Sequence, residues 1–527
     1  MFNQTDLNCA RRWISAASAA LLVTACGGGG GGSPAPTPTP TPTPTPLPGS
    51  FADTLAYSGA PTASLAAGIE GAAVVPMQIK VGTKTLDYTA TTGHLTATDA
   101  LTGQPAASFF YVAYTAGALP AAQRPVTFFY NGGPGSSSLW LHLGAFGPKR
   151  IVTNIPGTVM PSPAQLVENQ ETLLDHSDLV FIDAIGTGFS QAIAPRTNQQ
   201  FWGVDSDAGA FRDFVQRYVT VNARQASPKY LFGESYGAPR TGVLANLLEV
   251  AGVSLSAVVL QSAIMNYNSN CGVMNPGTLS CEGFIPSYAA VSAYHLRSNP
   301  LPTDLASYLL QALEFSTNQY GPAVNAYLAT NTPPPSGVVA QLVAFTGLPG
   351  ALWSSNLAMG PGQYRANLLS GQMIGRYDAR VHAALGSALT VDGDPSLTVV
   401  NATFTNTISS YIAGELRYTA KSSYLPFNNI INQWNFGHDG KAVPDTIPDL
   451  AAAITINPAL KVVAMSGYYD LATPFHQTEI DLLRLGLNPN IQVRNYGSGH
   501  MSYLDDTARL AQRADMITLY NSESVAK

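Results

Sequence analysis

Short apolar segments alternate with amphipathic segments between residues 125 and 260, and this order is the strongest constraint on the fold. The apolar runs lie at 125–130, 179–183, 229–232 and 256–260. Each run ends in turn residues and predicts a buried strand. Residues 211–222 and 239–250 place apolar side chains at helical spacing, with Asp205 and Ser206 as candidate caps of the first helix. Strands joined by crossover helices form a parallel sheet covered on both faces, so the sequence predicts an α/β fold that binds ligands beyond the carboxyl ends of its strands.

The α/β pattern is interrupted once. Residues 266–426 hold helical stretches and proline clusters without regular strand alternation, which indicates an inserted cap domain. Further strand patterns occur at 86–96, 109–115, 461–465 and 491–495. The first two favour an antiparallel section before the parallel part. We therefore expect a core built from two parts, 49–265 and 427–527, on either side of the cap.

The N-terminal residues predict an export signal. Arg11 and Arg12 precede an apolar run at 13–25, which is too short to span a bilayer but suits the core of a signal peptide. The run ends in Val-Thr-Ala before Cys26, an order that resembles a bacterial lipobox, in which cleavage leaves a cysteine that carries lipid. An ordinary cleavage site beside a chance cysteine is the alternative. We expect a signal peptide at 1–25 and lipidation of Cys26.

Residues 26–48 have the composition of a spacer. Glycines at 27–32 favour flexible coil, and the Thr-Pro repeat at 34–48 favours extended polyproline II. Such a spacer holds a folded body away from a membrane. The sequence therefore predicts an exported, membrane-anchored lipoprotein that faces the periplasm or the cell exterior, and Gly27 in place of an aspartate favours the outer membrane of a two-membrane cell.

Composition excludes several partners and cofactors. Only 11% of the residues are charged, the formal net charge is −6 and no basic stretch occurs, so no nucleic-acid partner is expected. The chain has no HExxH or Cys-x-x-Cys pattern, and no metal or other cofactor is expected. Cys9 leaves with the signal. In an oxidising exterior, Cys271 and Cys281 are expected to form a disulfide, with zinc ligation as the rival. The sequence does not indicate an oligomeric state.

A candidate nucleophile follows the third apolar run. Residues 233–237 are Gly-Glu-Ser-Tyr-Gly, and they join a predicted strand directly to a predicted helix. Glycines permit the tight turn that exposes a serine hydroxyl, which is the arrangement of a nucleophile elbow. The pattern alone is weak, and its flanks make it informative. Ser235 is therefore the candidate nucleophile, with a plain tight turn as the alternative.

A candidate acid and a candidate base follow Ser235. A serine hydroxyl needs a base to accept its proton, and an imidazole needs a carboxylate to orient it. Asp470 ends one of the late strands, and His500 follows the next. His476 is a competing base, but it lies at the start of a predicted helix. The order serine, acid, histidine is that of the α/β-hydrolases, so we predict a triad of Ser235, Asp470 and His500.

A glycine-rich loop follows the first apolar run. Residues 131–138 are Asn-Gly-Gly-Pro-Gly-Ser-Ser-Ser, whose glycines allow backbone amides to face a developing oxyanion. We expect this loop and the amide of Tyr236 to form an oxyanion hole. A phosphate-binding loop is the rival, but the segment lacks the Gly-Lys-Ser/Thr ending.

Five motifs together resemble the serine carboxypeptidase family. They lie at 131–138, 183–190, 233–237, 467–470 and 499–501. The resemblance extends over roughly residues 86–505 and implies an α/β-hydrolase fold that removes C-terminal residues from peptides with a free C-terminus. It implies the same triad, and it implies that the amides of Gly133 and Tyr236 form the oxyanion hole.

The resemblance also implies a site for the terminal carboxylate of the substrate. The family grips this group through residues that match Asn131 and Glu234. Two anions at close range raise one pKa, so the resemblance implies better peptide hydrolysis at acidic pH. The chain departs from the family pattern at Phe129, Ala145 and Ser136, where the family has tryptophan, glutamate and cysteine. The first two changes remove groups that support carboxylate binding.

Two other functions remain open from the sequence. An esterase, an acyltransferase or a prolyl aminopeptidase of the same fold is one, although Glu234 and the motif at 186–190 argue against the aminopeptidase. A surface-displayed binding protein with an inactive hydrolase fold is the other.

Overall fold

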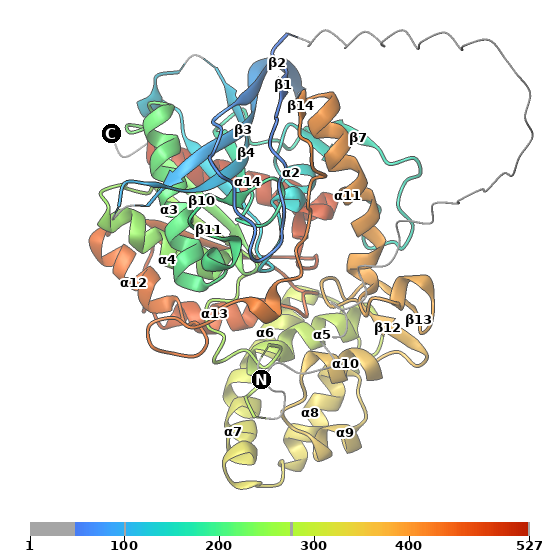
Figure 1. Ribbon diagram of the computed structural model, residues 1–527. Helices are drawn as coiled ribbons and strands as arrows, with labels where there is room; N and C mark the ends of the chain where they lie inside the picture. Colours follow the sequence, from blue (N-terminus) through green and yellow to red (C-terminus); the bar gives the residue numbers. More distant parts are fainter. Residues whose placement is uncertain (1–47, 100–101, 118, 274–277, 525–527) are drawn as a thin grey trace, which may run out of the picture.

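The computed structural model describes residues 48–99, 102–117, 119–273 and 278–524, and a ten-stranded mixed sheet lies at its centre (Figure 1). The predicted signal peptide, Cys26 and the tether up to residue 47 lie outside the described residues.

The central sheet contains every strand that the sequence predicted. Its strands are β2 (Ala72–Val81), β3 (Lys84–Thr98), β4 (Pro105–Ala116), β5 (Val126–Tyr130), β8 (Asp178–Ile182), β9 (Gln191–Ala192), β10 (Lys229–Glu234), β11 (Ala257–Gln261), β15 (Lys461–Gly467) and β16 (Ile491–Tyr496). The order is β16-β15-β11-β10-β5-β8-β4-β3-β2, with β9 beside β4. Strands β16 to β8 pair in parallel, whereas β8 to β2 pair antiparallel. The predicted α/β-hydrolase fold is confirmed.

The edge strand β2 was not predicted. It contains Pro76, whose missing N–H is tolerated only where no neighbour needs it, and an edge strand has such positions. Three short pairs lie outside the central sheet. They are β1 (Phe51–Ala52) with β14 (Tyr418–Thr419), β6 (Lys149–Ile151) with β7 (Leu166–Glu168), and β12 (Gln372–Ile374) with β13 (His382–Ala384).

Helices cover both faces of the sheet, and alternate residues of β5 point to opposite faces. Phe128 belongs to the core cluster that contains residues of α3, α4 and α12, while Phe129 belongs to the cluster that contains residues of α2, α11 and α14. These helices are α2 (Leu139–Gly144), α3 (Val204–Val221), α4 (Gly237–Val250), α11 (Pro395–Gly414), α12 (Ile447–Ile456) and α14 (Asp506–Ser524). The N-cap of α3 is Gly203, so Asp205 and Ser206 lie in its first turn and are not the caps that we expected.

A group of helices packs around a core of its own. This helical lobe, residues 285–367, comprises α5 (Ile285–Tyr294), α6 (Leu305–Phe315), α7 (Gly321–Thr330), α8 (Ser336–Thr346), α9 (Gly350–Ser355) and α10 (Pro361–Asn367). Figure 1 shows α7, α8 and α9 on the side away from the sheet. In contrast, Phe404 of α11 packs on Trp140 of α2, and α11 shares the core beneath the sheet. The predicted insertion 266–426 therefore contains both the helices of the helical lobe and α11, which packs against the core of the sheet.

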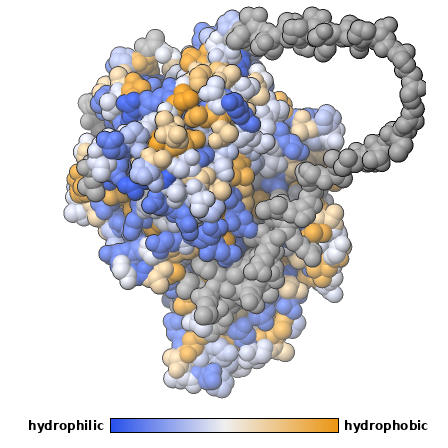
Figure 2. Space-filling view, in the orientation of Figure 1, coloured by the Kyte–Doolittle hydropathy of each residue, from blue (hydrophilic) through white to orange (hydrophobic). Residues whose placement is uncertain are grey.

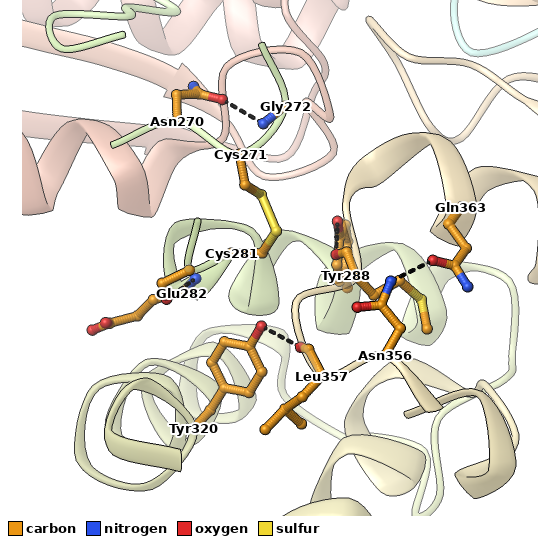
Figure 3. Close-up of a disulfide and its surroundings, with 12 residues drawn as sticks. Asn270, Cys271, Gly272, Cys281, Glu282, Tyr288, Tyr320, Asn356, Leu357 and Gln363 are labelled. Carbon is orange, nitrogen blue, oxygen red and sulfur yellow. Dashed lines mark hydrogen bonds between the residues drawn. A yellow bond between two sulfur atoms is a disulfide. The ribbon is translucent and has the colours of Figure 1, made fainter. Parts of the chain in front are cut away.

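The predicted disulfide is present at the base of the helical lobe. Cys271 and Cys281 are bonded, with their Cα atoms 5.4 Å apart, and both are fully buried. Figure 3 shows the bond beside Tyr320, whose hydroxyl donates to Leu357 O at 2.8 Å. The disulfide therefore ties the loop that leaves the sheet to the turn that leads into α5.

No helix in the described part of the chain is long and apolar enough to span a membrane. Hydrophilic and hydrophobic residues are interspersed over the face shown in Figure 2.

Candidate active site

The candidate nucleophile lies in a sharp turn between β10 and α4. Ser235 has a φ of 60°, a left-handed conformation that non-glycine residues rarely adopt. Gly233 is required before this turn because a Cβ there would lie 2.2 Å from Gly237 O. Ser235 is partly exposed, whereas its two neighbours in sequence are buried. The chain thus presents one hydroxyl at the carboxyl end of the sheet.

His500 and Asp470 meet at the same end of the sheet. His500 Nδ1 lies 2.7 Å from Asp470 Oδ2, and Asp470 Oδ1 accepts hydrogen bonds from the amides of Ala472 and Thr473 at 2.7 and 3.0 Å. Both side chains are buried. Because a carboxylate accepts the Nδ1 proton, Nε2 of a neutral imidazole is left as the acceptor. Burial opposes a charge on His500, but the Asp470 carboxylate outweighs it and raises the pKa of His500.

One glutamine connects the nucleophile turn to the histidine loop. Gln261, the last residue of β11, accepts a hydrogen bond from Ser235 N at 2.9 Å through its backbone oxygen. Its side-chain Nε2 donates to His500 O at 3.1 Å, and the Ser262 hydroxyl donates to the same oxygen at 2.6 Å. The Ser235 hydroxyl itself makes no hydrogen bond within the described residues, and such contacts are often loose in an unliganded serine hydrolase. No local sequence pattern indicates this role of Gln261.

The loop predicted to form the oxyanion hole lies against the nucleophile turn. A Cβ on Gly132 would lie 2.4 Å from Tyr236 N, so this backbone approaches the Tyr236 amide closely. Gly133 is exposed and has a φ of +105°, which a side chain would disfavour. The structure therefore places the candidate oxyanion donors Gly133 and Tyr236 on adjoining backbone segments beside Ser235.

The two residues predicted to bind a carboxylate lie together with a third residue that the sequence analysis missed. Glu234 Oε2 accepts a hydrogen bond from the Tyr503 hydroxyl at 2.7 Å, and the Asn131 side chain also bonds to Glu234. Asn131 is oriented through Oδ1, which accepts from Leu141 N at 3.1 Å. All three side chains are buried.

The pKa of Glu234 is raised to about 7. Burial is the largest cause, because it disfavours the charged form. The positive charge of a protonated His500 and the hydrogen bonds from Tyr503 and Asn131 act in the opposite direction, and the negative charge of Asp470 adds to the rise. Glu234 is therefore a neutral acid below pH 7.

A buried ion pair holds the backbone of Asn131 in place. Arg240 of α4 donates from Nε to Asp207 Oδ2 at 2.6 Å and from Nη1 to Asn131 O at 2.8 Å. Arg240 has no exposed surface and Asp207 is 3% exposed. This pair joins α3, α4 and the start of the glycine-rich loop. The sequence analysis did not identify it because α3 and α4 show no obvious complementary charge pattern.

A segment beyond the helical lobe covers the histidine loop. Tyr377 O accepts from His500 N at 2.6 Å, and the Tyr377 ring lies 5.0 Å from the imidazole. Arg380 donates to Asp378, to Asp505 and to Gly497 O. The competing base His476 instead pairs with Glu479 at 2.9 Å, and among the described residues it has no hydrogen bond to Asp470. In the described residues, no group of three or more His, Cys, Asp or Glu side chains could hold a metal ion.

The fold and this arrangement define an α/β-hydrolase with a serine elbow. Comparisons with known proteins agree with this fold. Residues 81–249 match the family described as serine carboxypeptidase. The chain is 35% identical over 118 residues to the pheromone-processing carboxypeptidase KEX1 of Cryptococcus gattii, covering 22% of this chain and 16% of that protein. It is 26% identical over 200 residues to serine carboxypeptidase ctsa-3.2 of Caenorhabditis elegans, covering 36% and 34%.

A solved structure shares the architecture. The crystal structure of the prohormone-processing carboxypeptidase KEX1 of Saccharomyces cerevisiae superposes with a TM-score of 0.52 at 15% identity, covering 82% of this chain and 91% of that one. The chain is thus similar to serine carboxypeptidases over part of its length, with the family match at residues 81–249, and it shares the fold of the solved structure. Its matches span about a sixth and a third of the two curated relatives.

Proposed function

We propose that this protein is a serine carboxypeptidase that removes C-terminal residues from peptides through an acyl-enzyme on Ser235 and works best at acidic pH. The observation that carries the proposal is the position of Glu234. Glu234 is a buried carboxyl group with a pKa of about 7, and it directly precedes Ser235. Its side chain is hydrogen-bonded to Asn131 and Tyr503. An endopeptidase or an esterase has no need of a neutral carboxyl group at this place.

The reaction uses the arrangement at the carboxyl end of the sheet. Ser235 Oγ attacks the carbonyl carbon of the last peptide bond while its proton passes to His500 Nε2. The amides of Gly133 and Tyr236 donate to the oxyanion. The C–N bond then breaks, its electron pair goes to the leaving nitrogen, and His500 returns the proton to that nitrogen. Water then gives a proton to His500 and attacks the acyl carbon; the bond from this carbon to Ser235 Oγ breaks, and His500 returns the proton to Oγ.

Recognition of the C-terminal carboxylate depends on the protonation of Glu234. A protonated Glu234 donates a hydrogen bond to the substrate carboxylate, while an ionised Glu234 repels it. The raised pKa means that Glu234 is protonated below pH 7 and ionised above it. Binding of free C-termini therefore weakens as the pH rises through 7.

The test compares an N-blocked dipeptide with its C-terminal amide between pH 4 and 8, using full-length protein in mild detergent. We expect the free acid to be cleaved much faster than the amide, with the difference largest in acid. Ser235→Ala is the blank and should lower the rate at least about 10³-fold. Equal cleavage of both substrates, or cleavage of esters or free-amino substrates only, would contradict the proposal and favour another hydrolase of this fold.

The proposal includes a location. The lipobox-like Val-Thr-Ala before Cys26 and the Thr-Pro spacer support a lipid anchor on the mature N-terminus, with the enzyme exported and facing the periplasm or the exterior. Wild-type protein is expected in the membrane fraction after expression in a bacterial host, and Cys26→Ser is expected to lose the lipid and leave that fraction. Mass spectrometry of the N-terminal peptide checks the lipid directly. An unmodified Cys26 in the mature protein would exclude the anchor.

A further inference from the structure

Tyr503 contacts both residues that the proposed function assigns to carboxylate recognition. Its hydroxyl donates to Glu234 Oε2 at 2.7 Å and shares a side-chain hydrogen bond with Asn131. Tyr503 is fully buried in the short helix η8 (Ser502–Leu504), directly after His500 and Met501. The tyrosine therefore reaches the recognition group from the segment that carries the histidine.

Small residues make room for the Tyr503 ring. A Cβ on Gly144, the last residue of α2, would lie 2.9 Å from Tyr503 Cε2, so the ring packs directly on this helix end. Ala145 follows and is also fully buried. The family resemblance implies a glutamate at position 145 that supports the same network. This chain instead supplies a phenol, from a residue 269 positions away from Glu234.

We propose that Tyr503 is a positioning residue for the C-terminal carboxylate, which holds Glu234 by Oε2 and directs the carboxyl proton of Glu234, on Oε1, toward the substrate. This inference rests on the proposed function. A carboxyl oxygen that accepts a hydrogen bond is a poor place for the proton, so the donor on Oε2 leaves Oε1 as the oxygen that carries it. The hydroxyl also contacts Asn131, the other residue that the proposed function assigns to the carboxylate.

The groups around Glu234 determine how loss of the Tyr503 hydroxyl changes the pH dependence of activity. The groups that face Glu234 are His500, Asp470, Tyr503 and Asn131. Burial raises the pKa of Tyr503 well above its usual range, so the phenol stays neutral where the enzyme works. The Tyr503 hydrogen bond stabilises the ionised form of Glu234. Removing the hydroxyl therefore raises the pKa of Glu234 further and moves the alkaline decline of carboxypeptidase activity to higher pH.

The test uses Tyr503→Phe, which keeps the ring and removes only the hydroxyl. Two substrates separate the roles: an N-blocked dipeptide with a free C-terminus, and the ethyl ester of the same dipeptide, which has no carboxylate. For the free acid, we expect KM at pH 5 to rise about tenfold with little change in kcat, and the alkaline decline to move up by about one pH unit. Kinetics on the ester should change by less than about twofold.

Tyr320→Phe is the matched control. Its hydroxyl is fully buried and donates to Leu357 O in the helical lobe, so its loss reproduces the cost of a missing buried hydroxyl without touching Glu234. This variant should leave KM and the pH profile of both substrates unchanged. A double-mutant cycle with Glu234→Gln should show that the two changes are not additive.

The outcomes are distinct. Equal losses on the free acid and the ester in Tyr503→Phe would mean that the hydroxyl only supports the fold, which overturns the inference. An unchanged KM and an unchanged pH profile for the free acid would overturn it as well. If the wild-type protein shows no preference for a free C-terminus, the proposed function itself fails, whatever Tyr503→Phe does.

Discussion

At the scale of single residues, neighbouring buried carboxyl groups acquire different tasks from their surroundings. Asp470 accepts two backbone amides and pairs with His500, a group that becomes positive during the reaction. Glu234 interacts electrostatically with the same imidazole, but its hydrogen-bond partners are a phenol and an amide side chain. Burial is therefore the largest influence on the pKa of Glu234 and raises it to about 7. In the proposed function, Asp470 orients the base, and protonated Glu234 donates a hydrogen bond to the substrate carboxylate.

Glu234→Gln is expected to remove the pH dependence of carboxylate recognition. The amide NH2 of glutamine donates a hydrogen bond at any pH, whereas Glu234 donates only when it is protonated, below pH 7. The wild-type kcat/KM for a free C-terminal substrate should fall as the pH rises through 7, and the variant should lack this fall. Initial rates between pH 5 and 8.5 measure it. Glu415→Gln, a change at the surface, serves as the control, and the same decline in both variants would speak against Glu234 as the titrating group.

At the scale of elements, the site depends on contacts between segments that lie far apart in the sequence. The turn at Ser235 and the loop at His500 are held by one residue of β11, Gln261. The helices α3 and α4 are joined by Asp207 and Arg240, which also binds the backbone of Asn131. Each of these side chains stabilises the position of a candidate site residue.

Arg240→Ala is expected to lower the free energy of unfolding by about 3–5 kcal/mol, because it leaves Asp207 buried without its counter-charge. Urea denaturation at pH 7 measures this. The control is Arg217→Ala, which breaks the exposed pair with Glu70 and should cost less than about 1 kcal/mol. Equal losses of unfolding free energy in the two variants would show that the buried pair contributes no more to stability than the exposed pair.

The disulfide is expected to stabilise the folded state because it closes a loop and so restricts the unfolded chain. Its cysteines are 10 positions apart, for which the chain-entropy argument gives about 3 kcal/mol. The double variant Cys271→Ala with Cys281→Ala should therefore unfold more readily, and limited proteolysis should cut first in the helical lobe, where both cysteines are packed. Proteolysis at the same rate as the wild type would contradict this role.

At the scale of the whole molecule, buried titratable groups set how stability varies with pH. Burial raises the pKa of Asp183 to about 7, although the amide of Ser138 donates to it at 2.8 Å. Its pKa in the unfolded chain is about 4. Because the folded pKa is the higher one, the folded state holds the proton more tightly, and stability falls as the pH rises from 4 to 7.

Asp183→Asn removes this titration. Asparagine keeps an oxygen for the Ser138 amide and carries no charge, so the variant should gain about 2–4 kcal/mol over the wild type at pH 8 and much less at pH 4. Urea denaturation at both pH values gives the comparison, and the acid measurement is the internal control. A difference that does not change with pH would exclude Asp183 as the titrating group.

The sequence predicted those features that are encoded locally. Strands such as β5 and β11 were predictable because each is a continuous apolar run, and Ser235 because its glycines and flanks form a local pattern. Tyr503 was not predictable, since its partner Glu234 lies 269 positions away and nothing in its own neighbourhood indicates the contact. Gln261 was missed for the same reason, as it acts on His500 from a distant strand.

The arrangement of the helical lobe was also beyond the sequence patterns. The first of its helices, α5, is buried on nearly all sides, so no apolar stripe indicates which face meets which neighbour. The sequence therefore predicted an insertion without its internal packing, and did not distinguish α11, which packs beneath the sheet.

The most direct test of a serine carboxypeptidase follows the products of one unmodified decapeptide by mass spectrometry at pH 5 and pH 8, with Ser235→Ala as the blank. We predict a ladder of peptides shortened one residue at a time from the C-terminus, faster at pH 5, and absent with the variant. Fragments from internal cleavage or from the N-terminus, or an intact decapeptide beside active ester hydrolysis, would contradict the account.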